Sequence, residues 1–283
     1  MILSAITHAT WNLLAKRAAN QELFIWWLLV SISVLLLPLA VILIWQYPIV
    51  YPGWWFVLGT CILHSFYFVF LGRGYTYADL SLVYPIARGL GPALVPVLGV
   101  LVLKEAVTLQ AVVGIIAVVV GIYTVYWWGR LRQIILQPFK FFREAGVRYA
   151  LLTGLVIAVF AVWDKVGVRY VNPFLYMYFL AFGSAVFLTP YALWSYGTRR
   201  VVVEGRKGVG SIVIAGALTF LSYSLLLLAL QFSRVSYVLP SRAVGIVVGV
   251  VLGTIVLREP FGKGRIIGSC LIVLGLALIA LAP

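Results

Sequence analysis

A series of apolar runs, each about 20 residues long, repeats along almost the whole sequence and constrains its fold more than any other feature. Of the 283 residues, 64% are hydrophobic and 10% are charged, so the chain has too few charged side chains to cover a globular domain of this size. Hydrocarbon about 30 Å thick is crossed by roughly 20 helical residues. The sequence therefore predicts an all-α integral membrane protein with ten transmembrane helices, over residues 1–17, 23–45, 54–72, 80–103, 107–128, 149–168, 173–195, 210–231, 235–257 and 264–282.

Other membrane architectures and covalent features fit the sequence less well. Strands of a transmembrane barrel alternate polar and apolar residues, and the stretch from Ala111 to Ile122 has no such alternation. Met1 leads directly into apolar sequence without a basic region, so we expect the first span to be retained. The two cysteines, Cys61 and Cys270, lie inside predicted spans, where a small buried side chain is expected rather than a disulfide or metal ligand. No cofactor is expected.

The net charge of +14 is distributed unevenly between the loops. In a soluble protein such a charge would indicate a nucleic-acid partner, but in a membrane protein its position along the chain decides its meaning. Most basic residues lie in or beside the odd-numbered loops, whereas the even-numbered loops hold Lys104, Lys165, Arg169 and Arg234. The positive-inside rule therefore predicts a multi-pass protein of the cell membrane with both termini outside, and no nucleic-acid partner is expected.

One glycine-containing pattern occurs twice in the sequence. The pattern R-x2-G-x7-G-x5-E-x8-G-x6-G begins at Arg88 and again at Arg242, with all five spacings identical. Nearer the start of each half, Trp11-Asn12 matches Trp163-Asp164. Self-similarity of this kind indicates an internal duplication. We interpret two stripes of glycines spaced by four residues, Gly245, Gly249 and Gly253 and then Gly264 and Gly268, as positions of close helix packing.

The duplication divides the chain into two halves of five helices. We expect a first repeat over residues 1–128, a basic segment over 129–148 and a second repeat over 149–283. The basic segment would suit either a helix on an anionic membrane surface or a solvated linker. Because five is an odd number of crossings, the second half is expected to enter the membrane in the opposite direction, which gives inverted repeats around a central cavity.

Two arginines lie near the middle of predicted spans. Arg88 follows Asp79 by nine residues, which places it roughly 14 Å from that helix end, and Arg242 occupies the equivalent position in the second half. An arginine at this depth costs at least about 2.5 kcal/mol, so each is expected to face a hydrated cavity or a partner within the bundle. Pairing with Asp164 or with backbone carbonyls is the alternative interpretation.

Polar and aromatic side chains form matched stripes on the other predicted spans. His8, Trp11 and Asn12 share one helix face through their i, i+3, i+4 spacing, and Phe160, Trp163 and Asp164 repeat the arrangement. The candidate binding residues are Arg88, Arg242, His8, Trp11, Asn12, His64, Tyr67, Tyr84, Trp163, Asp164 and Tyr223.

Each of these positions has a structural interpretation as well. His8 and His64 would also fit as buried histidines with satisfied hydrogen bonds, and the aromatic residues as packing or lipid-facing side chains. Asp164 could instead pair with the adjacent Lys165. Glu105 and Glu259 precede glycine-containing helices, where capping of a helix start is the simpler role for a carboxylate.

The segments His8 to Lys16 and Tyr84 to Gly89, with the paired Glu-x8-Gly-x6-Gly motifs, resemble the EamA-type branch of the drug/metabolite transporter superfamily. The resemblance covers nearly the whole chain. It implies ten helices in two inverted repeats, with a central cavity lined by the first, third, fourth, sixth, eighth and ninth helices and with the fifth and tenth helices at the periphery. It is poorly specific for substrate, because the family's cargo includes amino acids, other metabolites and drugs.

The sequence favours a secondary transporter that moves a small polar or amphipathic metabolite, either amino-acid-like or an organic anion, by alternating access. The basis is an excess of positive charge at mid-membrane, with Asp164, His8 and His64 as candidate groups for proton coupling. A multidrug or lipid-intermediate exporter is the alternative, supported by the 15% aromatic content. An intramembrane enzyme is a remote third, since neither H-E-x-x-H nor G-x-S-x-G occurs and no catalytic residue is expected.

Overall fold

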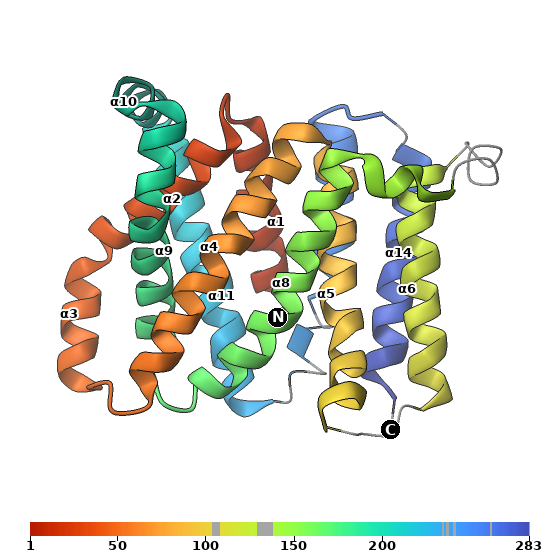
Figure 1. Cartoon of the computed structure of the whole chain (residues 1–283), viewed down its shortest axis with the longest axis horizontal. Helices are drawn as coiled ribbons and strands as arrows, with labels where there is room; N and C mark the ends of the chain where they lie inside the picture. Colours follow the sequence, from red (N-terminus) through yellow and green to blue (C-terminus); the bar gives the residue numbers. More distant parts are fainter. Residues whose placement is uncertain are drawn as a thin grey trace.

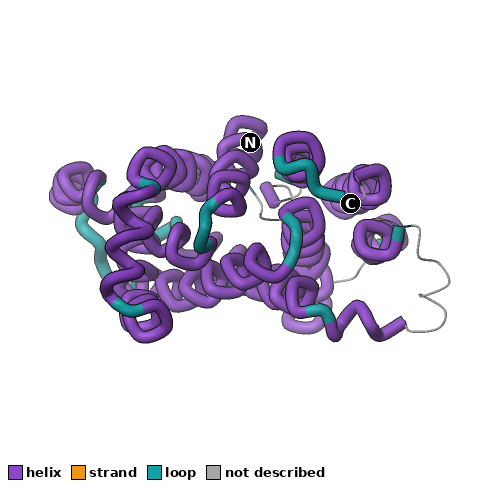
Figure 2. Tube along the Cα trace, turned by 90° about the horizontal axis from the view of Figure 1, so that it is seen from above, coloured by secondary structure: helices purple, strands orange, loops and turns teal. Residues whose placement is uncertain are grey.

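The computed structural model describes residues 1–103, 108–128, 138–233, 235, 238–239, 242–260 and 262–282, and this part of the chain is helical without strands (Figures 1 and 2). The elements are α1 (Ile2–Arg17), α2 (Gln21–Leu35), α3 (Leu37–Gln46), α4 (Gly53–Tyr77), α5 (Leu80–Leu103), α6 (Leu109–Trp127), η1 (Pro138–Arg143), α8 (Ala145–Gly167), α9 (Pro173–Tyr196), α10 (Thr198–Lys207), α11 (Val209–Phe232), α13 (Val244–Val251), η2 (Leu252–Val256) and α14 (Gly262–Ala280).

The structure has helices where the sequence predicts membrane spans. Six of those described, α4, α6, α8, α9, α11 and α14, are long and apolar enough to cross a membrane, and the bent pair of α2 and α3 would make a seventh span. The three other predicted spans overlap α1, α5 and the α13–η2 segment. The all-helical membrane fold is therefore confirmed, and the count of ten crossings stays a prediction.

Local sequence sets several helix ends. The side chain of Asn20 accepts a hydrogen bond from the amide of Leu23 at 2.9 Å and begins α2, and Asn172 caps α9 in the same way just before Pro173. The bend of 57° between α2 and α3 coincides with Pro38 in the first turn of α3. Proline lacks an amide hydrogen and its ring clashes with the preceding turn, so the predicted span 23–45 is broken there.

Contacts between named residues fix the directions of the first helices of the two halves. Lys16, at the end of α1, reaches the carbonyl of Tyr75 at the end of α4, so α1 and α4 run in parallel. Trp163, near the end of α8, donates to the carbonyl of Phe56 at the start of α4, so α4 and α8 are antiparallel. Helix α8 therefore runs opposite to α1, as inverted halves require (Figure 1).

Glycines of the repeated pattern account for the packing of α6 against α14, the pair at one end of the elongated bundle (Figure 1). A Cβ added at Gly114 would lie 2.7 Å from the carbonyl oxygen of Gly275, and one at Gly121 would lie 2.7 Å from that of Gly268. The last two glycines of the pattern in the first half thus face the last two in the second half: Gly114 faces Gly275, and Gly121 faces Gly268. The interpretation of Gly268 as a packing position is confirmed, and its partner Gly121 was not singled out as one from the sequence.

The first glycine of the pattern is Gly91 in one half and Gly245 in the other. Each packs the segment that carries the arginine against the first helix of the opposite half. A Cβ at Gly91 would lie 2.5 Å from Cγ2 of Ile157 on α8, and a Cβ at Gly245 would lie 3.2 Å from the Cβ of Ala5 on α1. The spacing R-x2-G therefore places each arginine close to a helix–helix crossing near the middle of the bundle.

The helix α10 is a feature that the ten predicted spans do not include. It follows the end of α9 and lies at the edge of the molecule that is uppermost in Figure 1. Its Val201 and Gly205 are buried against α2, and its basic residues Arg199, Arg206 and Lys207 are exposed. We call this edge the basic face, because the ends of α1 and α4 and the start of α8 bring further arginines to it.

Within the predicted basic segment 129–148, the described part forms the short helix η1 and the start of α8. Residues 129–137 lie outside the described part, as do Glu105 and Arg234. The division into repeats and the orientation with both termini outside stay predictions.

Candidate functional site

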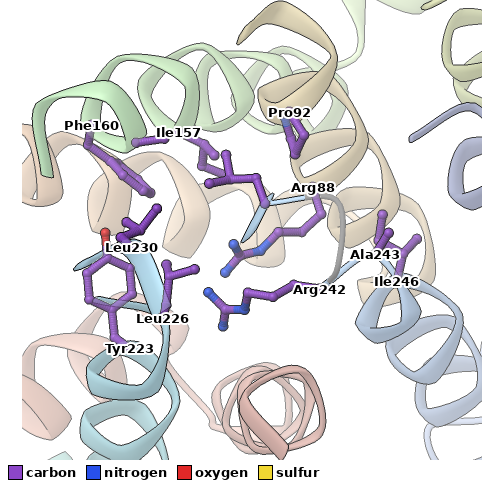
Figure 3. Close-up of a pocket in the computed structure, with 12 residues that line it drawn as sticks. Arg88, Pro92, Ile157, Phe160, Tyr223, Leu226, Leu230, Arg242, Ala243 and Ile246 are labelled. Atoms are coloured by element: carbon purple, nitrogen blue, oxygen red, sulfur yellow. The ribbon is translucent and has the colours of Figure 1, made fainter. Parts of the chain in front are cut away.

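Arg88 and Arg242 face each other across a small cavity in the centre of the bundle (Figure 3). Arg88 projects from α5, and Arg242 lies in the turn just before α13. The Nη2 of Arg242 donates to Ser222 Oγ at 2.8 Å and to the Ser4 carbonyl at 3.4 Å. Its Nη1 is buried without a hydrogen-bond partner in the described part of the chain. A buried charged donor without a partner is costly, and this one belongs to a guanidinium that lines the cavity.

No carboxylate neutralises the arginine pair among the described residues. The ion pairs found there involve Arg73, Arg265 and His64, and neither Arg88 nor Arg242 takes part in one. Arg88 instead lies over the ring of Tyr84, with Cζ 5.9 Å from the ring centroid, and has Tyr67 Oη 3.5 Å from Nη2. Two like charges that face each other in a region of low dielectric repel, so an anion between them would be strongly favoured.

The central space is divided into two adjoining cavities of about 30 and 20 Å³. Arg88, Phe160 and Tyr223 line both of them. A void of this size holds about one or two waters. The bundle is therefore contracted around the arginine pair, and a metabolite would need the helices to move apart.

The second cavity carries unsatisfied polar groups of its own. Trp11 Nε1 donates to His8 Nδ1 at 3.1 Å, so a neutral His8 has its hydrogen on Nε2. That Nε2 and the hydroxyl of Thr219 are buried without partners in the described part of the chain, and both residues line the cavity. A ligand held by the arginines could receive a further hydrogen bond here.

Asp164 lies in a hydrogen-bond network that borders the cavities through Tyr223. It is fully buried and accepts hydrogen bonds from Tyr176 at 2.8 Å and from Tyr223 at 2.5 Å. His64 continues the network, with Nε2 3.1 Å from Tyr223 Oη and Nδ1 3.0 Å from Thr60 Oγ1. Asp164 therefore pairs with tyrosines, and neither the arginines nor Lys165 is its partner.

Two lysines have matching roles at the ends of α1 and α8, the first helices of the two halves. Lys16 donates to the carbonyls of Tyr75 and Ala78 at the end of α4. Lys165 donates to those of Leu230 and Ser233 at the end of α11, at 2.5 and 2.8 Å. A cation at a helix C-terminus satisfies carbonyls that have no partner within the helix.

The basic face is closed by contacts between the two halves. Both carboxylate oxygens of Glu259 accept from the amides of Leu80 and Ser81, at 2.8 and 2.9 Å, and cap the start of α5. Arg265 is buried beside it, 2.7 Å from Asp79 and 3.7 Å from Glu259. The expectation that Glu259 caps a helix start is confirmed, and the helix belongs to the other half.

The structure brings together only part of the set of candidate residues predicted from sequence. The two cavities are lined by His8, Trp11, His64, Tyr67, Arg88, Tyr223 and Arg242. The remaining four do not line them: Tyr84 lies beside Arg88 and His8, Asn12 accepts from Tyr75, Trp163 packs on Phe56, and Asp164 is held by its tyrosines. A role in binding stays a prediction for all eleven.

The candidate binding residues did not include Thr60, Tyr176, Thr219 or Ser222, although Ser222 was expected from the sequence to face the cavity with Tyr223 and Ser224. Each is an uncharged polar residue in an apolar helix, and each gains its meaning from a partner on another helix. Only the stripe of Ser222, Tyr223 and Ser224 carried a detectable signal, because three polar residues in succession are unusual within a span.

A family model for the EamA-like transporter family matches residues 1–127 and again residues 144–281. The chain belongs to this family. Its fold is thereby that of a membrane transporter of the drug/metabolite type, and its two matched segments cover nearly the whole length. EamA-like proteins are transporters rather than enzymes, and the family implies a small-molecule substrate. A comparison with curated proteins finds no significant match.

Proposed function

We propose that this EamA-like chain moves a small metabolite with an anionic group, of the amino-acid or organic-anion class, by alternating access. The observation that carries the proposal is the facing pair of Arg88 and Arg242, which has no carboxylate partner in the described part of the chain and leaves one Nη atom unsatisfied. A carboxylate could bridge the two guanidiniums and satisfy that donor.

The surroundings of the arginines support a ligand with an apolar part as well. Phe160, Leu226 and Ile246 line the first cavity, and Trp11 and Phe68 line the second. Aromatic lining also favours the alternative, a multidrug exporter for lipophilic cations, but the buried carboxylate that would attract a cation, Asp164, is occupied by two tyrosine hydroxyls.

Alternating access is supported by the asymmetry of the contacts. On the basic face, Glu259 and Arg265 hold the second half against the start of α5. The first cavity is lined instead by Leu230, near the end of α11, and that end of α11 lies on the opposite side of the bundle from the basic face (Figure 1). In the mechanism that we propose, this conformation is closed at the basic face, and the oppositely directed halves give a second conformation closed at the other.

Proton coupling is supported by the network around His64. Since Tyr223 donates to Asp164, its oxygen accepts from His64 Nε2–H, and neutral Nδ1 accepts from the Thr60 hydroxyl. The carbonyl of Thr60 lies 3.1 Å from the same Nδ1, so an added proton there would find an acceptor in place. The titratable and charged groups around His64 in the described part of the chain include Tyr67, Arg88, Asp164 and Tyr223, with His8 in the wall of the same cavity. Tyr223 connects this network to the cavity that holds the arginines.

The proposal is tested by counterflow in proteoliposomes, with amino acids, organic anions and lipophilic cations as separate probes. For the best anionic probe, we expect Arg88→Gln and Arg242→Gln each to weaken apparent affinity about 10- to 100-fold, because a charge-assisted hydrogen bond contributes about 1.5–3 kcal/mol. Arg199→Gln, which removes an exposed charge on α10, is the matched control and should have no effect.

Unchanged uptake in the double variant Arg88→Gln/Arg242→Gln would exclude the arginine pair as the binding site. Counterflow of lipophilic cations alone, without any anionic probe, would favour the multidrug alternative. A size-exclusion profile of each variant shows whether it folds.

A further inference from the structure

A further cavity, larger than the two central ones, lies at the basic face, away from the arginine pair. Its volume is about 270 Å³, and it is formed by the end of α1, the turn into α2, and the junction of α10 with α11. Polar residues that line it include Arg17, Glu204 and Lys207, and apolar ones include Phe24, Trp27 and Ile212. None of these residues lines the central cavities.

The charged groups of this cavity are unpaired within the described part of the chain. Arg17 and Lys207 are exposed, Glu204 is half-buried, and none of the three takes part in an ion pair there. Two cations and one carboxylate give the cavity a formal charge of +1. A phosphodiester carries one negative charge and offers oxygen acceptors to both cations, so its charge matches that of the site.

The cavity has an apolar part in addition to the cations. Phe24 and Ile212 are buried in its wall, and the indole of Trp27 lies beside them. Inorganic phosphate would leave this surface without a partner, whereas the glycerol backbone and acyl chains of a lipid would cover it. A ligand with an anionic head and an apolar body therefore fits better than a free anion.

The position of α10 places this cavity at the level of lipid head groups. The helix begins directly after α9, where Gly197 has a φ of 73° and turns the chain. Trp27 Nε1 donates to the carbonyl of Val201 at 2.9 Å, and a Cβ at Gly205 would collide with the indole ring, so α10 is held against the end of α2. Val201 and Gly205 of α10 point inward, and its basic residues are exposed beside Val202 and Val203. A short helix of basic and apolar residues at the edge of the bundle is typical of a membrane interface, where tryptophan is also enriched.

We propose that the cavity between α1, α2, α10 and α11 binds a membrane phospholipid through its phosphate, with Arg17 and Lys207 as the contacts and with an anionic head group preferred over a zwitterionic one. This inference does not depend on the transported substrate. It assigns α10 a role as one wall of a lipid site, and it predicts that lipid composition affects the stability of the protein.

Native mass spectrometry of the purified full chain in detergent tests the proposal. The probes are phosphatidylglycerol, phosphatidylcholine and inorganic phosphate, each added to delipidated protein. We expect phosphatidylglycerol to be retained most strongly and to raise the unfolding temperature. Arg17→Gln/Lys207→Gln should reduce its retention about tenfold or more.

The matched control is Arg199→Gln/Arg206→Gln, which removes the same charge from α10 at exposed positions that do not line the cavity. A charge-preserving variant, Ser211→Trp, fills the cavity from its exposed edge and should reduce lipid retention while the net charge is unchanged. Equal losses in the control and the site variant, or equal retention of the two lipids, would overturn the proposal. Full competition by inorganic phosphate would show an anion site without lipid specificity and would also overturn it.

Discussion

At the scale of single residues, Tyr223 connects the titratable pair His64 and Asp164 to the cavities that Arg88 lines. Its hydroxyl lies between His64 and Asp164, and its ring lines the cavities that Arg88 shares. If His64 takes up a proton when an anion enters, the two events are linked through this one side chain. This linkage between proton uptake and anion entry can be measured separately from the affinity for the anion.

We therefore expect Tyr223→Phe to lower uptake that is driven by a proton gradient by about tenfold or more, while counterflow without a gradient continues. The variant removes the hydroxyl that joins His64 to Asp164 and leaves the aromatic wall in place. Tyr178→Phe is the control, because its hydroxyl donates to the Ser33 carbonyl outside the cavities. Equal losses of gradient-driven uptake and counterflow in Tyr223→Phe would contradict the coupling role.

The sequence identified the two candidate arginines and two of their neighbours, Tyr67 and Tyr84, but not the polar residues that complete the network of His64 and Asp164. Arg88 and Arg242 stand out because a cation in an apolar span is costly and because the pattern repeats. Thr60 and Tyr176 are uncharged, so they do not stand out in an apolar span as an arginine does. Their contacts with His64 and Asp164 depend on how α4, α8 and α9 pack. Only the three-dimensional arrangement shows them.

At the scale of helices, the interface of α6 and α14 depends on glycines. Gly121 and Gly268 place a backbone carbonyl of each helix where a side chain of the other would otherwise lie. We expect Gly268→Val to force the helices apart and to destabilise the protein by about 1–3 kcal/mol, as overpacked positions do.

Thermal unfolding in detergent measures this effect. Gly210→Ala on α11 is the control, because a Cβ there would meet nothing within 4 Å. That control should be neutral or stabilising by up to about 1 kcal/mol, since alanine favours helix over glycine. Similar losses of stability in both variants would mean that close packing at Gly268 is not the cause.

Helix positions could be predicted where they depend on hydrophobic length, and not where they depend on local breaks. The apolar runs located the long helices within a few residues. The break at Pro38 and the short helix α10 were missed, because both are smaller than the 20-residue window that a membrane span needs. The three consecutive valines of α10 within a basic stretch are the signal that could have found it.

At the scale of the whole molecule, the closure of the basic face rests on a few groups from opposite halves. Glu259 accepts from two amides of α5, and Arg265 lies between it and Asp79. We expect Glu259→Gln to weaken this closure, because an uncharged amide binds a helix N-terminus less strongly and leaves Arg265 with one carboxylate.

Labelling with a membrane-impermeant maleimide detects such opening. The reporter is Ser81→Cys, at a fully buried position beside Glu259, in a background with Cys61→Ala and Cys270→Ala. Glu259→Gln should raise its labelling rate about tenfold, and Glu144→Gln, which changes an exposed carboxylate near the start of α8, should not. An unchanged rate in Glu259→Gln would show that other contacts hold the face closed.

The direction of the two halves follows from the odd number of helices that the sequence predicts in each, and the opposed α1 and α8 agree with it. Which face is closed could not be predicted in this way. In the proposed mechanism the same sequence forms one conformation closed at the basic face and one closed at the opposite face. Their relative stability depends on contacts such as those of Glu259 with the other half.

The small volume of the central cavities has a thermodynamic consequence. With room for about one or two waters, the empty protein is denser than any form that encloses a metabolite. Part of each ligand's interaction energy must then be spent on parting the helices, and its dissociation constant will understate the strength of its contacts. Hydrostatic pressure, which favours the smaller of two volumes, should accordingly expel the cargo.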